Sequence, residues 1–177
     1  MRIISGSLKG RRIIAPKKLP VRPTTDRSKE AIFNILQNQY DLENTVALDL
    51  FSGTGNISYE FGSRGGKNVT AVDQNRMCVD FIRKTSEILE LKIQVIQMKV
   101  IKYLSTKSKS FDLIFADPPY DMEINQYVNM IETIFENNLL KQEGLLIIEH
   151  VEQKKMECYT RFFQSKKYGN SVFSFFK

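Results

Sequence analysis

The feature that most constrains the fold of this chain is a regular alternation of short apolar runs with stretches of helical periodicity. Short apolar runs bounded by polar residues are typical of buried strands, whereas apolar residues three or four positions apart are typical of amphipathic helices. A repeated strand–helix order predicts an α/β fold in which helices cover both faces of a mostly parallel sheet. Strands are expected at Thr45–Leu50, Asn68–Val72, Lys92–Gln97, Phe111–Ala116 and Leu145–Glu149, and helices at Asn56–Arg64, Asn75–Leu89 and Gln126–Asn137.

The two ends of the chain depart from this alternation. Residues 1–19 alternate loosely around Gly6 and Gly10, which predicts a short β-hairpin, and a helix is expected from Thr25-Asp26 onward. A chain of 177 residues without an internal repeat or linker is expected to form one structural domain, with residues 1–26 as a basic extension packed on a core of residues 27–177. A second hairpin is expected at the C-terminal end, from Arg161–Lys166 and Ser171–Phe176 around Tyr168-Gly169-Asn170.

Basic residues are concentrated near the N-terminal end. Residues 1–30 hold nine basic and two acidic residues, a net charge of +7, which leaves −1 for the other 147 residues. A basic segment attached to a nearly neutral body is expected of a protein that binds a polyanion. The alternative is a solvated basic arm that has no partner.

A candidate cofactor site follows the first expected strand, where Asp49 and Leu50 lead into Phe51-Ser52-Gly53-Thr54-Gly55 and then into a helix. Glycines let the backbone approach a ligand closely, and a helix N-terminus offers free N–H groups. The Asp49 carboxylate suits a cationic amino acid group and would repel a pyrophosphate. Asp73, at the end of the second strand, is placed to accept both hydroxyls of a ribose, and the missing third glycine disfavours a dinucleotide.

A candidate catalytic tetrad, Asp117-Pro118-Pro119-Tyr120, comes directly after the fourth expected strand. Two consecutive prolines fix two φ angles and remove two donors, which makes the loop rigid and leaves carbonyl groups free. The carboxylate of Asp117 and the carbonyl of Pro118 could together accept the two N–H bonds of an exocyclic amino group. Tyr120 offers a ring on which a planar base can stack.

These motifs resemble those of the class I methyltransferases that modify amino groups. The resemblance is closer to the RsmD family, which methylates N2 of a guanine in 16S ribosomal RNA, and it extends over nearly the whole chain. The matching segments are Arg2-Ile3-Ile4-Ser5-Gly6 with Gly10-Arg11-Arg12, Arg22-Pro23-Thr24-Thr25-Asp26-Arg27 with Glu30–Leu36, Asp49–Gly55, Asp73, Asp117–Tyr120 and Tyr168-Gly169.

The resemblance implies a Rossmann-like class I methyltransferase fold with a seven-stranded, mostly parallel sheet that ends in an antiparallel hairpin. It implies S-adenosylmethionine as the cofactor, ribosomal RNA or the assembling small subunit as the partner, and a monomer without a metal. Expected catalytic residues are Asp117, Pro118 and Tyr120; expected cofactor contacts are Thr24, Asp49, Phe51, Gly53, Gly55 and Asp73; expected RNA contacts are Arg11, Arg12, Arg22 and Arg27.

One departure from the family pattern follows the third expected strand. Enzymes of this kind usually place there an aspartate that accepts from the adenine amino group of the cofactor, whereas this chain has Gln97-Met98-Lys99-Val100. If Lys99 occupies that position, an acceptor is replaced by a group that can only donate. Weaker cofactor binding, or a contact from a neighbouring carbonyl, would follow.

Composition argues against several other classes of protein. No apolar stretch approaches the roughly 20 residues that span a bilayer, and the first residues lack the apolar region of a signal peptide, so a cytoplasmic protein is expected. Cys78 and Cys158 belong to no metal-binding or redox motif and are expected to be free, packed thiols. His150 is expected to be an ordinary residue at the end of a strand.

Alternative functions remain open at this point. Adenine N6 in RNA or DNA and the amide of a protein glutamine also present a planar NH₂, although the basic segment disfavours a protein substrate. A binding module that kept the fold and lost the cofactor is the alternative outside enzymes. Lys99 is compatible with that module, whereas Asp49, Asp73 and the complete tetrad argue against it.

Overall fold

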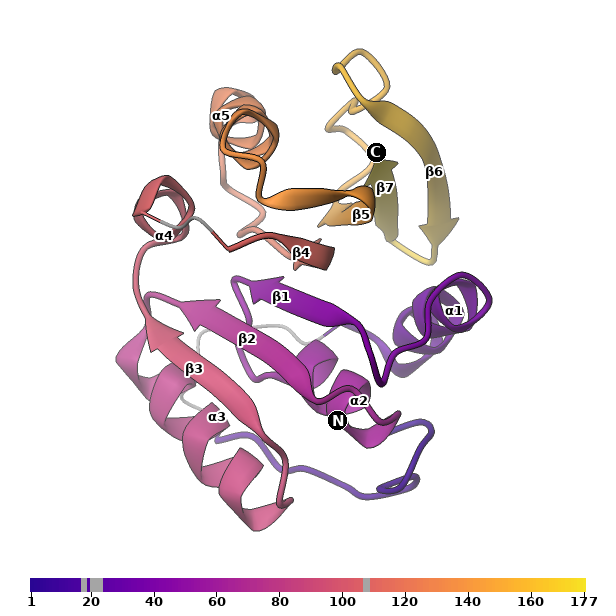
Figure 1. The fold of residues 1–177 in the computed structure, drawn as a ribbon, viewed down its shortest axis with the longest axis vertical. Coiled ribbons are helices and arrows are strands. Elements are labelled where there is room, and N and C mark those ends of the chain that lie inside the picture. The colour runs from indigo at the N-terminus through magenta and orange to yellow at the C-terminus, as the bar shows by residue number, and fades with distance from the viewer. Residues whose placement is uncertain (17–18, 20–23, 107–108) are drawn as a thin grey trace.

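The computed structural model describes residues 1–16, 19, 24–106 and 109–177, and its centre is a seven-stranded sheet with the order β3-β2-β1-β4-β5-β7-β6 (Figure 1). The strands β1 to β5 are parallel, as the strand–helix alternation predicts. These strands are β1 (Val46–Leu50), β2 (Asn68–Asp73), β3 (Ile93–Gln97), β4 (Phe111–Ala116) and β5 (Leu140–His150), and the helices are α1 (Asp26–Gln37), α2 (Asn56–Ser63), α3 (Arg76–Ile88), α4 (Val100–Thr106) and α5 (Ile124–Glu136).

The C-terminal hairpin is also formed as predicted, from β6 (Phe162–Tyr168) and β7 (Ser171–Phe176). The later strand, β7, lies inside the sheet, where it pairs antiparallel with both β5 and β6. Its aromatic side chains Phe173, Phe175 and Phe176 are fully buried. The outer strand β6 forms one edge of the sheet.

Helices cover both faces of the sheet, and alternate residues of each strand face opposite sides. Leu48 and Leu50 of β1 belong to a core cluster with side chains of α4 and α5, whereas Ala47 belongs to a second cluster with α1 and α2. In Figure 1, α4 and α5 accordingly lie on one side of the sheet and α1 on the other. The side chains of the parallel strands that face α1 and α2 therefore pack against these two helices.

The register of the strands brings their carboxyl ends to one edge. Leu50 pairs with Val72 on one side and with Ala116 on the other, and Ala116 pairs with Ile148. Asp73, Asp117 and Glu149, each one residue further along, therefore lie at the carboxyl ends of their strands, at the same edge of the sheet. In an open parallel sheet, ligands bind in the crevice outside this edge.

The expected N-terminal hairpin is not formed. The segment contains one isolated antiparallel bridge, between Arg2 and Arg12, instead of two strands. Backbone hydrogen bonds join Ile3 to Arg11 and Ile13 to Met1 around this bridge, both at 3.0 Å. Beyond them, the N–H groups of Ile4 and Ser5 donate to the carboxylate of Glu60 in α2, at 2.8 and 3.1 Å. The pairing between the two arms therefore stops after a few bonds, and the segment continues along α2 instead of extending a ladder.

Two buried residues fasten the N-terminal segment to the core. Lys29 of α1 and Glu60 of α2 form an ion pair at 3.2 Å with no exposed side-chain surface, and Lys29 Nζ also donates to the carbonyl of Arg2 at 2.7 Å. Arg64 adds a second contact to Glu60 at 2.7 Å. One of the nine basic residues at this end thus acts inside the protein.

Candidate active site

The glycine turn after β1 is built around three left-handed residues. Phe51, Gly53 and Gly55 have φ angles of 56°, 53° and 78°. A Cβ at Gly55 would lie 2.8 Å from Cζ of Tyr59, so this glycine is needed for packing as well as for its backbone conformation. Gly55 does not line the cavity described below, whereas Phe51 and Gly53 do.

Asp73 fixes the shape of this turn from the end of β2. Its Oδ2 accepts from the backbone N–H of Gly53 at 2.8 Å, and its Oδ1 accepts from the N–H of Asn75 at 2.7 Å. Each carboxylate oxygen has further lone pairs, so both can still accept from a ligand hydroxyl. Asp73 therefore joins the glycine turn to the start of α3.

Asp49 lies beneath the turn and is almost completely buried. Ser58 of α2 donates to its Oδ2 at 2.6 Å. Burial raises the pKa of Asp49 to about 7, against the opposing effect of the Ser58 hydrogen bond, and the negative charge of Asp73 raises it further. A cationic group entering the cavity would favour the ionised form of Asp49.

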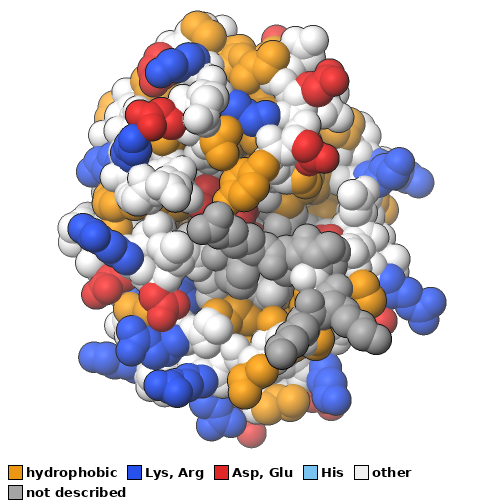
Figure 2. Space-filling view, turned by 180° about the vertical axis from the view of Figure 1, so that it is seen from behind, with side chains coloured by type: hydrophobic (Ala, Val, Ile, Leu, Met, Phe, Trp, Pro, Cys, Tyr) orange, Lys and Arg blue, Asp and Glu red, His pale blue; other side chains and the backbone are white. Residues whose placement is uncertain are grey.

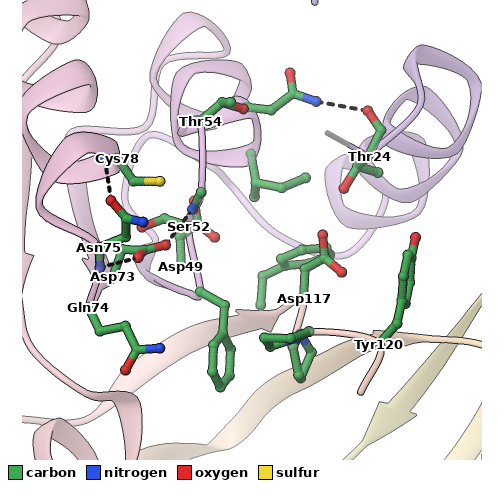
Figure 3. Close-up of a pocket in the computed structure, with 17 residues that line it drawn as sticks. Thr24, Asp49, Ser52, Thr54, Asp73, Gln74, Asn75, Cys78, Asp117 and Tyr120 are labelled. Carbon is green, nitrogen blue, oxygen red and sulfur yellow. Dashed lines mark hydrogen bonds between the residues drawn. The ribbon is translucent and has the colours of Figure 1, made fainter. Parts of the chain in front are cut away.

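The cavity at this edge of the sheet has a volume of about 520 Å³, which is within the usual range for small-molecule sites. Figure 3 shows its two sides. Asp73, Gln74, Asn75 and Cys78 lie on one side, Asp117, Tyr120 and Thr24 lie on the other, and Asp49 and Ser52 lie between them.

The tetrad forms the second side. The N–H of Asp117 donates to the carbonyl of Leu50 at 3.3 Å, which ties the end of β4 to the end of β1. Burial raises the pKa of Asp117 well above its usual range, and the neighbouring carboxylates of Glu149 and Asp49 raise it further. Tyr120 is 48% exposed at the mouth of the cavity.

Most of the residues predicted for the cofactor and catalytic sites therefore line this one cavity. The cavity is lined by Thr24, Asp49, Phe51, Gly53, Asp73, Asp117, Pro118 and Tyr120, all of which the sequence pointed to. Lys99 is exposed between β3 and α4 and does not line it. Its carbonyl accepts from Tyr103 N at 3.0 Å.

Several lining residues were missed by sequence reasoning. Asn56, Gln74, Asn75 and Cys78 contribute to the wall, as do Ser52 and Thr54, which the sequence placed in the glycine motif without naming them as contacts. Asn75 could have been found, because an Asn directly before a helical pattern is a typical cap, and its side chain accepts from Met77 N at 2.9 Å. The hydroxyl of Ser52 is buried and has no hydrogen-bond partner among the described residues, so the cavity wall contains a polar group that a ligand could satisfy.

Three of the four predicted RNA-binding arginines are described, and all three are exposed. Arg11, Arg12 and Arg27 are exposed, and Arg22 lies outside the described residues. Figure 2 shows the lower part of the face seen there surrounded by Lys and Arg side chains. Lys29, in contrast, is buried and unavailable to a ligand.

The cysteines and the histidine form no further centre. Cys78 is buried, as expected, whereas Cys158 is exposed, because it lies in the irregular segment between β5 and β6. His150 ends β5, as expected, and its Nε2 shares a 2.8 Å hydrogen bond with Ser174 Oγ. Among the described residues, no group of His, Cys, Asp and Glu could hold a metal ion, and no helix is both long and apolar enough to cross a membrane.

Comparison with known proteins agrees with this architecture. The chain is 34% identical to YlbH of Bacillus subtilis (strain 168), over 85% of this chain and 82% of that protein. It is 32% identical to ribosomal RNA small subunit methyltransferase D of Buchnera aphidicola subsp. Baizongia pistaciae, over 84% and 75% of the two chains. The solved structure of yhhF from Escherichia coli superposes with a TM-score of 0.87 at 23% identity, covering 99% of this chain and 96% of the other.

The family assignment follows from a match along the full sequence. Residues 1–177 match the family described as Conserved hypothetical protein 95. The resemblance seen in the motifs is thereby confirmed, and so is the α/β architecture with its C-terminal antiparallel hairpin. The chain belongs to this RsmD/YlbH family and has the class I methyltransferase fold.

Proposed function

We propose that this protein transfers a methyl group from S-adenosylmethionine to the exocyclic N2 of a guanine in small-subunit ribosomal RNA. The observation that carries the proposal is the single cavity that joins Asp49 and Asp73 to the tetrad at Asp117. One side suits a charged nucleoside and the other suits a planar amine. Ribosomal RNA as the substrate class is supported by the name of the Buchnera relative.

The residues of the first side fit the cofactor. Asp73 can accept from ribose hydroxyls, Asp49 can pair with the ammonium group, and the unpartnered hydroxyl of Ser52 can bind a polar group of the amino acid moiety. When bound, S-adenosylmethionine supplies an electrophilic methyl group on a positively charged sulfur. Alignment of the two reactants is then the main task of the protein.

The residues of the second side hold the amine. The Asp117 carboxylate accepts one N–H of the amino group, and the Pro118 carbonyl accepts the other. Asp117 has a raised pKa, so it is a stronger base than an exposed carboxylate and can take the proton that the amine loses on methylation. Tyr120, exposed at the mouth, provides a stacking surface worth roughly 1–3 kcal/mol.

The basic N-terminal segment supplies the affinity for RNA in this proposal. Arg11, Arg12 and Arg27 are exposed and free of the buried ion pairs that hold the segment in place. Contacts of such residues with phosphates position a nucleic acid without reading its sequence. The choice of base is left to the cavity.

The test is to map the labelled methyl group. Total RNA and intact small subunits from cells that lack this protein are incubated with the enzyme and methyl-labelled S-adenosylmethionine, and the modified nucleotide is located. We expect one guanine labelled at N2. Asp117→Ala should abolish labelling while the cofactor still binds in calorimetry.

Other products would contradict specific parts of the proposal. Label at adenine N6, in RNA or DNA, would overturn the choice of base, and label in protein would overturn the substrate class. Failure to bind S-adenosylmethionine would indicate a binding module that lacks the cofactor. Equal loss of cofactor binding and transfer in Asp117→Ala would remove Asp117 from the amine side.

A further inference from the structure

Thr24 reaches the cavity from outside the sheet and is held by a carboxylate far away in sequence. Its Oγ1 donates to Oε2 of Glu149 in a buried hydrogen bond of 2.8 Å. Glu149 is only 3% exposed, and its other oxygen, Oε1, accepts from Ser171 Oγ at 2.7 Å. Two hydroxyl donors from separate parts of the chain therefore hold this carboxylate in place.

The backbone of Thr24 is fixed as well. Its carbonyl accepts from Asn56 Nδ2 at 2.9 Å, and Asn56 Oδ1 accepts in turn from the buried amine of Lys29 at 2.8 Å. The side-chain bond and the backbone bond leave Thr24 little freedom to turn. Its position in the cavity wall is thus set before a substrate arrives.

The direction of the Thr24 hydrogen bond determines what the hydroxyl can do in the cavity. A hydroxyl has one hydrogen and two lone pairs. The hydrogen of Thr24 is directed at a carboxylate oxygen, so only lone pairs remain for a ligand. Thr24 therefore presents an acceptor, and no donor, on the side of the cavity where Asp117 and Tyr120 lie (Figure 3).

We propose that Thr24, held by Glu149, is a specificity-determining residue that accepts the N1–H of the target guanine beside its amino group. This inference rests on the proposed function. Guanine carries a donor at N1 next to its N2 amine, whereas adenine carries an acceptor at N1 next to its N6 amine. A fixed acceptor on the side of the cavity where Asp117 binds the amine can accept from N1–H of guanine. The same acceptor repels the lone pair at N1 of adenine, so it disfavours adenine as well as binding guanine.

The inference gives Thr24 a role that differs from the cofactor contact expected from the sequence. The cofactor side of the cavity is marked by Asp73 and Asn75, and Figure 3 shows Thr24 across the cavity from both. Removal of its hydroxyl should therefore leave cofactor affinity unchanged. This difference separates the two roles by measurement.

The experiment uses the RNA substrate identified by methyl mapping, with either guanine or 2-aminopurine at the target position. 2-Aminopurine keeps the C2 amino group but has neither the hydrogen at N1 nor the oxygen at C6, so the Thr24→Val variant assigns the part of the difference that belongs to N1. Wild-type enzyme should methylate the guanine RNA with a kcat/KM up to about tenfold higher than the 2-aminopurine RNA, within the range expected for one neutral hydrogen bond. Thr24→Val should lose about tenfold on guanine and almost nothing on 2-aminopurine.

Two controls isolate the hydroxyl. Thr24→Ser keeps it and should retain the preference for guanine, which a purely steric role of the threonine would not explain. Thr25→Ser changes the neighbouring threonine, which caps α1 through a 3.2 Å bond from Ser28 N, and should also leave the preference intact. Calorimetry with S-adenosylmethionine should give the same Kd for wild type and Thr24→Val.

Each contrary result has a distinct meaning. Equal rates of the wild type on the two RNAs, or an unchanged preference in Thr24→Val, would overturn the role of Thr24 while guanine methylation stands. A raised Kd for S-adenosylmethionine in Thr24→Val would return the residue to the cofactor side. Absence of guanine methylation by the wild type is a failure of the proposed function itself, and it is seen before any variant is made.

Discussion

Ser58 Oγ donates a 2.6 Å hydrogen bond to Oδ2 of Asp49 beneath the glycine turn, and both side chains are buried there. Hydrogen bonding by Ser58 does not compensate the carboxylate for the loss of water, so burial raises the pKa of Asp49 to about 7. Free protein near neutral pH is therefore a mixture of the neutral and ionised forms of Asp49. A cationic cofactor selects the ionised form.

The affinity for S-adenosylmethionine should accordingly rise with pH. Below pH 7 the proton on Asp49 must be released before the ammonium group can pair with it, so Kd should increase as pH falls from 8 to 6. Asp49→Asn should bind more weakly and lose this dependence. Calorimetry in two buffers of different ionisation enthalpy would detect the released proton, and a pH-independent Kd in the wild type would contradict the pairing.

The same substitution should stabilise the empty protein. Asp49 has a higher pKa folded than unfolded, so its ionisation costs folding free energy, and this cost grows as pH rises from about 4 to about 7. Asp49→Asn keeps an acceptor for Ser58 and removes the buried charge. Its Tm should exceed that of the wild type at pH 8 by several degrees, with the difference shrinking toward pH 4. A lower Tm at pH 8 would mean that the charge is better compensated than the structure indicates.

Glu149 should control the pH dependence of methyl transfer through Asp117. Burial first, and then the negative charge of Glu149, raise the pKa of Asp117. Glu149→Gln removes that charge, so the pKa of Asp117 should fall and the acidic limb of the kcat/KM profile should move to lower pH. Ser171→Ala removes one hydrogen bond from Glu149 and keeps its charge, so it should leave the limb in place. A purely structural role of Glu149 would lower the rate without moving the limb.

The N-terminal arginines should carry part of the salt dependence of RNA binding. Each phosphate contact contributes about −0.7 to the slope of log K against log salt concentration for a single strand. Arg11→Ala with Arg12→Ala should therefore flatten the slope by about 1.4. Lys67→Ala with Lys141→Ala removes the same charge at the edge of the sheet opposite the cavity, where β2 and β5 begin, and should change the slope little. Equal effects of the two pairs would assign the salt dependence to net charge alone.

The buried pair of Lys29 and Glu60 should matter far more for stability than a surface pair. Lys29→Met leaves the Glu60 carboxylate buried with one cation fewer, which typically costs about 3–5 kcal/mol of unfolding free energy. Glu43→Gln breaks the exposed pair with Lys67 and should cost less than about 1 kcal/mol. Urea unfolding would compare them, and a similar cost for both would show that Arg64 alone satisfies Glu60.

The parts of the fold that depend on local patterns could be predicted. Strands buried on both faces appear as apolar runs, so Phe111–Ala116 was predicted without error and β1 to within one residue. Helix α4 was missed because its seven residues, Val100–Thr106, are too short to show a helical period. The strand β5 begins five residues before the apolar run that marked it, since Lys141, Gln142 and Glu143 near its start are polar and exposed.

The parts that depend on distant partners could not be predicted. The first residues do alternate, but the backbone N–H groups of Ile4 and Ser5 bind Glu60, more than fifty positions away, and no local pattern records that acceptor. The hydrogen bond between Thr24 and Glu149 spans 125 positions. The sequence predicts that residues at the ends of neighbouring strands lie close together. It does not predict that Thr24, which lies outside the sheet, contacts Glu149.

The place of β6 at the edge of the sheet has a consequence for solubility. An edge strand presents unpaired backbone groups to which another chain can add, and lysines along it oppose such pairing. Lys166 and Lys167 lie on β6, and Lys177 covers the exposed ring of Phe163 with its Nζ 4.5 Å from the ring centre. We expect these lysines to oppose aggregation through this edge, and removal of their charge to expose an aromatic-rich hairpin to its own copies.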